Sequence, residues 1–160
     1  MQTLQKANDQ QKAALLAGIG ATGCIIVLSF LSSQSGALWL MAPFGATMVI
    51  LFGLPASPLA QPRNVIAGHV ITAAVGLIVA HFLGVHEWTL GVAVGLSVTA
   101  MMLTQTLHPP AGANPLLIML TGEDWHFLLT PVASGAILIV GFGYLYHRGI
   151  SGQRYPERWL

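Results

Sequence analysis

Four polar side chains lie inside stretches that are otherwise apolar, and their types suit the binding of an anion or the movement of a proton. Thr47 and Asn114 each directly follow a Gly-Ala pair, where they could offer a hydroxyl and an amide donor. His69 lies within a long apolar stretch, where ionisable residues are rare and usually functional. His108 precedes two prolines. Because histidine titrates near neutral pH, His69 or His108 could couple transport to protons.

Proline and glycine interrupt the backbone near these side chains, at Pro43 and Gly45 and again from Pro109 to Gly112. A half-helix that begins at such a break offers free N–H groups and a partial positive charge to an anion. Asn114 is expected to cap the second half-helix, with Pro115 in its first turn. The predicted substrate-binding residues are Gly45, Ala46, Thr47, Arg63, His69, His108, Pro110, Gly112 and Asn114.

Each of these features also has a purely structural interpretation. The two breaks could be kinks that allow helices to pack closely. Arg63 could anchor the topology beside the bilayer instead of attracting an anion at the pore entrance. His69 could be a hydrogen-bonded packing residue, and His108 could cap the end of the broken segment.

The elements that position these residues follow from the composition. Apolar types make up 54% of the 160 residues and charged types only 7%, with a net charge of +1. Soluble domains carry about a quarter charged residues, so a soluble enzyme and a disordered chain are excluded. Six Lys and Arg form no basic stripe, which excludes a nucleic-acid binder. The composition indicates an integral membrane protein.

Uncharged runs divide the chain into six apolar segments between two polar ends. We expect a polar N-terminal segment (1–12), a transmembrane domain (13–147) and a polar C-terminal tail (148–160). A helix needs about 20 apolar residues to cross a bilayer. The segments lie at about 13–31, 37–54, 65–83, 88–107, 114–120 and 126–146, the second and fifth being the interrupted ones.

An internal duplication relates the two halves. A shift of 67 positions places Pro43, Gly45 and Ala46 on Pro110, Gly112 and Ala113. The same shift places Gly68 and Gly76 on Gly135 and Gly143. The sequence therefore predicts two repeats, at about 13–83 and 88–147.

The predicted fold class is an all-α polytopic bundle of two structural repeats, with about four full transmembrane helices and two broken or half-helical segments. If the broken segments cross, the repeats are inverted and the chain crosses six times; if they dip in and return, it crosses four times. Six crossings place every Lys and Arg on the cytoplasmic side together with both termini, as the positive-inside rule favours. Six crossings are therefore preferred.

Three stretches of the sequence resemble the motifs of a known family. The stretch His108–Leu116 (HPPAGANPL) resembles the signature of the HPP family of small integral membrane proteins, and residues 42–46 (APFGA) and 57–69 (SPLAQPRNVIAGH) are similar to its other motif stretch. The resemblance covers essentially the whole chain. It implies a membrane protein usually described with four spans, and association of some members with nitrite transport.

These observations predict transport of a small inorganic anion, nitrite being the leading candidate, through a site near the midplane where the broken segments meet. An anion channel and an oligomerising scaffold without transport are the alternatives. The sequence carries no HExxH, Walker A or Rossmann motif, so we expect no enzyme, no cofactor and no metal site. The expected partners are the lipid bilayer, the anion and, because the chain is short for a carrier, further copies of itself. We expect a bacterial plasma (inner) membrane protein.

Overall fold

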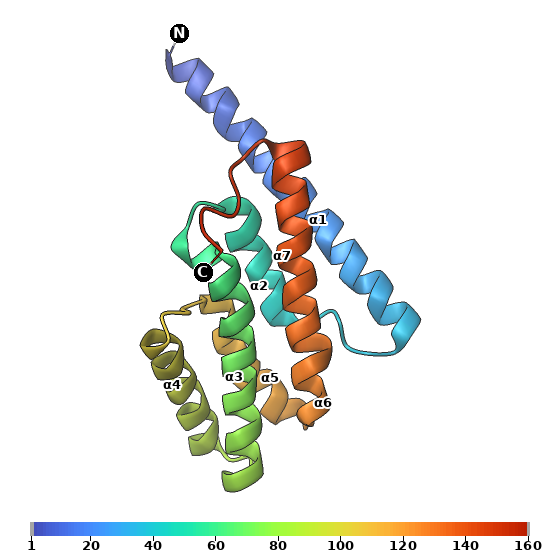
Figure 1. The fold of residues 1–160 in the computed structure, drawn as a ribbon, viewed down its shortest axis with the longest axis vertical. Coiled ribbons are helices and arrows are strands. Elements are labelled where there is room, and N and C mark those ends of the chain that lie inside the picture. The colour runs from blue at the N-terminus through green and yellow to red at the C-terminus, as the bar shows by residue number, and fades with distance from the viewer. Residues whose placement is uncertain (1, 160) are drawn as a thin grey trace.

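The structure, a computed structural model, describes residues 2–159 and is helical throughout its ordered elements. Figure 1 shows an elongated bundle in which the N-terminal helix projects beyond the other helices at one end. The main helices are α1 (Gln2–Ser35), α2 (Ala42–Gly53), α3 (Pro62–Leu83), α4 (Glu87–Leu103), α5 (Asn114–Thr121) and α7 (Ser134–Tyr146). Short helical turns join them: η1 (Pro58–Ala60), η2 (Pro109–Ala113), α6 (Trp125–Phe127), η3 (Leu128–Ala133) and η4 (His147–Ser151).

Within residues 2–159, three helical stretches are long and apolar enough to cross a membrane, namely Gln5–Ser35, Pro62–Leu83 and Trp125–Ser151. Large apolar side chains point away from the core along the bundle, including Leu103 (80% exposed) and Phe82 (74%). Such a surface is unfavourable in water and suits a lipid environment. The protein is an all-α membrane protein, as the composition predicted.

The two interrupted segments form short helices. Pro43 lies in the first turn of α2, and Gly122 ends α5 in a left-handed conformation (φ 72°) that favours glycine. At 1.5 Å per residue the 12 residues of α2 rise about 18 Å and the 8 residues of α5 about 12 Å. Neither helix by itself crosses a hydrocarbon core of about 30 Å. The number of membrane crossings stays a prediction.

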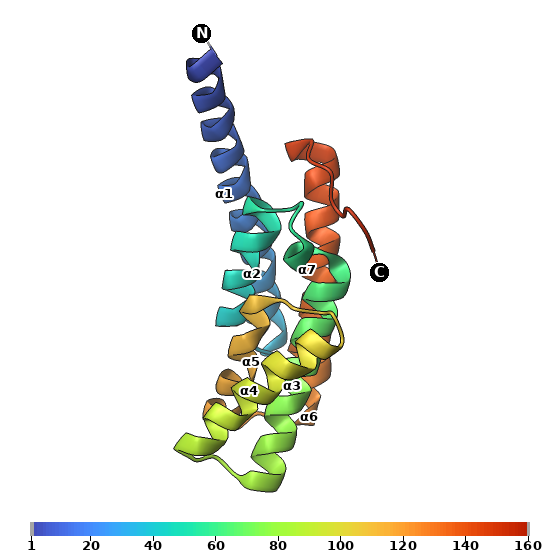
Figure 2. The same ribbon diagram turned by 90° about the vertical axis from the view of Figure 1, so that its left-hand side faces the viewer.

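Direction along the bundle alternates from one helix to the next in both views (Figures 1 and 2). In Figure 1, α1 runs downward, α2 upward and α3 downward, whereas α4 runs upward, α5 downward and α7 upward. The helices α1–α2–α3 therefore have counterparts of opposite direction in α4–α5–α7. This arrangement is the one expected for two inverted repeats that begin at α1 and α4.

Glycines that are equivalent under the shift of 67 positions make equivalent close contacts. A Cβ atom on Gly68 would lie 2.9 Å from Cβ of His108, and one on Gly135 would lie 2.8 Å from Cζ of Phe44. Each of these glycines thus lies in the long helix of one half and packs against the broken segment of the other half. Each interrupted segment therefore packs on the long helix of the other half, which brings both interrupted segments to the centre of the molecule.

The second pair of equivalent glycines repeats this pattern one step further along. A Cβ atom on Gly76 would lie 2.7 Å from Cα of Pro115 in α5, and one on Gly143 would lie 2.9 Å from Cδ2 of Leu51 in α2. The absence of a side chain at these positions is what lets α3 approach α5 and α7 approach α2.

Both polar ends are more structured than their composition indicates. The segment expected at 1–12 continues into α1, which is helical from Gln2 to Ser35. The C-terminal tail folds back onto the bundle, where Tyr155 is 4% exposed and its hydroxyl donates to the Ala60 carbonyl at 3.0 Å. The tail therefore forms part of the packed structure beside η1.

Candidate functional site

The four polar side chains singled out from the sequence meet in one buried cluster. Thr47 comes from α2, His69 from α3, His108 from the turn before η2 and Asn114 from the start of α5. None is more than 1% exposed. Residues far apart in the chain are brought together because the broken segment of each half packs against the long helix of the other.

A continuous line of hydrogen bonds joins these side chains. Nδ2 of Asn114 lies 3.0 Å from Nδ1 of His69, whose Nε2 lies 2.9 Å from Oγ1 of Thr47. The same Oγ1 lies 2.9 Å from Nε2 of His108, whose Nδ1 lies 2.8 Å from the Leu59 carbonyl oxygen. We call this line, from Asn114 to Leu59, the polar chain.

The partners at its two ends assign the protons along the polar chain. A carbonyl oxygen only accepts, so Nδ1 of His108 carries a proton and its Nε2 accepts from the Thr47 hydroxyl, which shares its one hydrogen with the Pro43 carbonyl oxygen at 3.1 Å. At the other end the amide NH₂ of Asn114 donates to Nδ1 of His69, so Nε2 of His69 carries the proton and donates to Thr47. Both imidazoles are accommodated in the neutral form, and all the donors point in one direction, from Asn114 toward Leu59.

Asn114 binds across the bundle instead of capping its own helix as the sequence predicted. Its Nδ2 also lies 3.0 Å from the His69 carbonyl oxygen and 3.0 Å from Oγ1 of Thr72, and the side chain makes no capping bond. Because η2 leads directly into α5, the chain there is already helical and a side-chain cap is not needed. Oδ1 of Asn114 is buried without a hydrogen-bond partner among the described residues.

Aromatic and apolar groups separate the polar chain from the surroundings. The ring of Phe44 packs edge-on against His69 with centroids 4.9 Å apart, and the two imidazole rings lie 5.0 Å apart. A polar network in such a setting is electrostatically strong and sensitive to any missing partner. The arrangement can relay a proton between two imidazoles through a hydroxyl, provided that the amide of Asn114 can turn.

The remaining predicted site residues lie outside the polar chain. Gly45 and Ala46 are exposed on α2, and Gly112 is half-buried in η2. Ala46 and Pro110 line an open apolar hollow of about 460 Å³ between α2 and η2. Arg63 is exposed in the first turn of α3 and donates to the Thr104 carbonyl at 2.8 Å.

The start of α2 offers fewer free amides than the sequence predicted. The backbone N–H groups of Phe44 and Gly45 both donate to the Met41 carbonyl oxygen, at 3.0 and 3.4 Å. At the other break, the N–H of Ala111 donates to the His108 carbonyl at 3.0 Å. The first turns thus close on themselves, so the side chains, not the free amides, supply most of the polar character at the junction.

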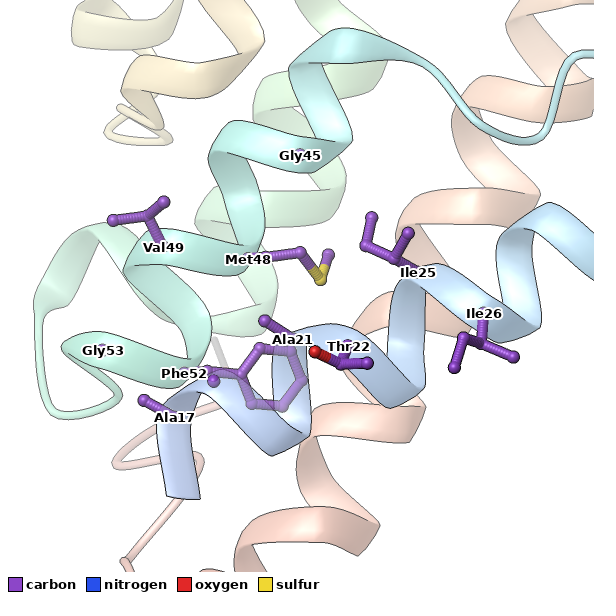
Figure 3. A pocket seen from close by; sticks show the side chains of 11 residues that line it. Ala17, Ala21, Thr22, Ile25, Ile26, Gly45, Met48, Val49, Phe52 and Gly53 are labelled. Atoms are coloured by element: carbon purple, nitrogen blue, oxygen red, sulfur yellow. The ribbon is translucent and has the colours of Figure 1, made fainter. Parts of the chain in front are cut away.

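Another hollow, shown in Figure 3, is apolar and lies away from the polar chain. It measures about 580 Å³ and opens between α1 and α2, with Ala21 and Ile25 on one wall and Met48 and Phe52 on the other. Of the predicted site residues it includes only Gly45. Its lining offers an anion almost no polar partner and resembles a groove that faces lipid.

Sequence reasoning missed two contributors. Thr72 lies one helical turn after His69, and its hydroxyl donates to the Gly68 carbonyl at 2.9 Å while accepting from Asn114. The i,i+3 spacing was the available signal. His147, which directly follows the last apolar segment, is 1% exposed, with Nε2 3.0 Å from the Leu51 carbonyl oxygen. Its place near a predicted helix end concealed this role.

The fold and the buried polar chain define an α-helical integral membrane protein with two interrupted segments. Over residues 6–156 the chain matches the family described as HPP, transmembrane region, and it belongs to this HPP family.

Two transmembrane proteins of Dictyostelium discoideum are similar to it, one 32% identical over 84% of this chain and the other 36% identical over 75%. The chain spans about half the length of these relatives, 47% and 45%. No solved structure matches the chain.

Proposed function

We propose that this protein transports a small inorganic anion, with nitrite as the first candidate, and couples the movement to protons. The observation that carries the proposal is the polar chain itself, because it links the two broken segments through Thr47 and His108 at the centre of the molecule. Matched interrupted helices that meet inside the membrane mark the substrate path of many transporters. The proposed role is transport and involves no covalent chemistry.

The unpaired Oδ1 of Asn114 supports coupling to a proton. If His69 gained a proton at Nδ1, that nitrogen would face the amide NH₂ of Asn114 as donor against donor. Rotation of the amide would present Oδ1 instead, which has no other partner among the described residues. Protonation would then break the bonds from Asn114 to Thr72 and to the His69 carbonyl. A proton on His69 thus loosens the contact between α3 and α5.

The contact between the two broken segments indicates which parts of the molecule must move during transport. Thr47 and His108 are fully buried, and their bond holds α2 against the turn before η2. An anion can pass between the broken segments only when this bond opens, which fits rocking of one repeat against the other.

We propose that the protein lies in a bacterial plasma membrane with both termini in the cytoplasm. The charge distribution supports this orientation of the termini. In Figure 1 the start of α1 and the end of α7 lie toward the upper end and the start of α3 lies near mid-height, whereas the start of α4 and the α5–α6 turn lie toward the lower end. Lys6, Lys12, Arg63 and Arg148 belong to the first group, Arg154 and Arg158 lie in the tail that follows α7, and Glu87, Glu123 and Asp124 belong to the second group. This is the positive-inside pattern.

We further propose a homo-oligomer, which light scattering of the purified protein would test.

The test is nitrite flux into proteoliposomes under a proton gradient. Thr47→Val keeps the side-chain shape but removes the hydroxyl that both imidazoles bind, and Asn114→Leu removes the amide. The matched control is Thr99→Val, since Thr99 is an exposed helical threonine whose hydroxyl bonds only the Gly95 carbonyl.

We expect flux to fall strongly in Thr47→Val and Asn114→Leu and to remain in Thr99→Val, with equal insertion of all three. Wild-type flux no greater than that of empty liposomes would reject nitrite as the substrate and favour the scaffold alternative. Equal flux in Thr47→Val and Thr99→Val would remove the polar chain from the mechanism.

A further inference from the structure

A small polar pocket lies at the N-terminus of α3. It has a volume of about 90 Å³ and is lined by Gln61, Arg63, Asn64, Gln105 and Arg158. The other hollows named above are lined mainly by apolar side chains. Two of the six Lys and Arg residues of the chain are gathered here, although 94 intervening positions separate them in the sequence.

The C-terminal tail is fixed so that Arg158 lies at this pocket. Oε1 of Gln61, a residue only 2% exposed, accepts from the backbone N–H groups of Glu157 and Arg158 at 2.8 and 3.3 Å. Nε2 of Gln61 donates to the Pro55 and Ser57 carbonyls at 3.0 and 2.8 Å. Every polar atom of the Gln61 side chain is thus used to attach the tail to η1 and the start of α3.

Arg63 and Arg158, both exposed, line the pocket together, and no carboxylate lines it. Arg63 uses Nη2 to donate to the Thr104 carbonyl at 2.8 Å, which leaves its Nη1 and Nε for another partner. No aspartate or glutamate is among the lining residues, and within residues 2–159 the structure describes a single ion pair, from Arg154 to Glu157 at 3.8 Å. Two positive side chains at one small pocket repel each other, and an anion bound between them would offset this repulsion.

The wall opposite α3 is held in an unusual backbone conformation. Gln105 has φ 57°, in the left-handed region that residues other than glycine rarely adopt. Residues in such conformations cluster at binding sites, where the surrounding structure holds them. Hydrogen bonds from Gln105 N to the Met102 carbonyl at 3.1 Å and from Thr106 N to the Met101 carbonyl at 2.8 Å fix this turn.

We propose that this pocket binds a small oxyanion between Arg63 and Arg158, with the amides of Gln105 and Asn64 as further donors. Its volume corresponds to roughly three water molecules, since a water occupies about 30 Å³ in the liquid. That space suits a free inorganic anion such as nitrite better than a whole lipid headgroup, although the phosphate of an anionic lipid has the same chemistry.

The pocket is close to one end of the polar chain. Gln61 follows Leu59, the final acceptor of that chain, by two residues, and Nδ2 of Asn64 donates to the Leu107 carbonyl at 2.9 Å, directly before His108. An anion held by the two arginines would therefore lie beside the junction of the broken segments, before its passage between them. This role rests on the proposed function, whereas binding of the anion does not.

Binding can be measured through Cys24, the single cysteine of the chain, which is fully buried. Purified protein in an uncharged detergent and a gluconate buffer is heated with a maleimide that fluoresces on reaction with a thiol. Cys24 reacts as the protein unfolds, so the fluorescence reports the thermal unfolding transition. A ligand that binds only the folded state raises the midpoint of thermal unfolding, so titration with sodium nitrite gives an apparent Kd. Nitrate, sulfate and phosphatidylglycerol are titrated in the same way.

The variants are Arg158→Gln, Gln105→Gly and, as the control on the same tail, Arg154→Gln. Loss of one guanidinium should weaken nitrite binding at least about fivefold. Gln105→Gly should weaken it less while keeping the turn, because glycine adopts positive φ freely. Arg154→Gln should bind as the wild type does.

Nitrite binding that is equal in Arg158→Gln and Arg154→Gln overturns the proposal, as does a wild-type midpoint that no inorganic anion shifts. A shift produced by phosphatidylglycerol alone overturns it in favour of a lipid site. Binding of nitrite by a protein that shows no nitrite flux supports the pocket, rejects nitrite as the transported anion and favours the scaffold alternative. Flux that is unchanged in Arg158→Gln, with binding lost, removes the pocket from the transport path.

Discussion

The contact between Gly76 and Pro115 gives a sharp test of the packing that places Asn114 against His69. In Gly76→Ala the new Cβ would lie 2.7 Å from Cα and 3.2 Å from Cβ of Pro115. Carbon atoms in contact are about 3.5–4.0 Å apart, so α5 must move away from α3 by about 1 Å. Overpacking of this kind costs about 1–3 kcal/mol.

Helix propensity acts in the opposite direction, because alanine is favoured over glycine by about 1 kcal/mol in a helix interior. The control is Gly91→Ala in α4, where nothing lies within 4 Å of the new Cβ and only the propensity gain applies. We therefore expect Gly76→Ala to be less stable than Gly91→Ala by about 1–3 kcal/mol.

The maleimide reaction of Cys24 measures both variants as denaturant or temperature unfolds them. The same shift of about 1 Å would stretch the bond from Nδ2 of Asn114 to Nδ1 of His69, now 3.0 Å, beyond hydrogen-bonding distance. Gly76→Ala should therefore also lose nitrite flux, whereas Gly91→Ala should keep it. Equal stability of the two variants would refute the close approach of α3 and α5.

Two further predictions concern buried groups near the end of the bundle. His147→Leu leaves the Leu51 carbonyl without its partner and should destabilise the fold by about 1–3 kcal/mol in the thiol assay, whereas His126→Leu, at an exposed position, should not. If both variants unfold alike, the bond from His147 does not hold η4 against α2. Burial raises the pKa of Tyr155, so the folded state retains this proton at a pH where the unfolded chain loses it. Stability should therefore fall as pH rises above about 10, the usual tyrosine value, and Tyr155→Phe should reduce that fall while costing about 1 kcal/mol at neutral pH through loss of the bond to Ala60. An alkaline unfolding curve that is unchanged in Tyr155→Phe would contradict this.

Much of the architecture could be predicted from the sequence, because membrane insertion is governed by local composition. Long uncharged apolar runs indicated the spans, and Pro43 and the prolines after His108 indicated where helices are interrupted. The shift of 67 positions also paired Gly68 with Gly135 and Gly76 with Gly143. These pairs carry information because a glycine within a helix has a cost that close packing must offset.

The candidate site could be predicted only as a set of residue types. Thr47, His69, His108 and Asn114 stood out because polar groups are expensive inside a membrane. Their order in the polar chain depends on which helices touch, and the sequence does not state that the broken segment of one half packs on the long helix of the other. The capping role predicted for Asn114 failed for this reason, since its amide finds better partners on α3 than on its own helix.

The sequence by itself determined that this chain is a helical membrane protein of the HPP family with two interrupted segments, since apolar runs and helix-breaking residues act locally. Only the tertiary structure decided that the polar side chains form one directional hydrogen-bond chain. It also decided that the tail brings Arg158 to the pocket that Arg63 lines, and that His147 is buried. These features depend on contacts between residues far apart in the sequence, and such contacts exist only once the helices have packed.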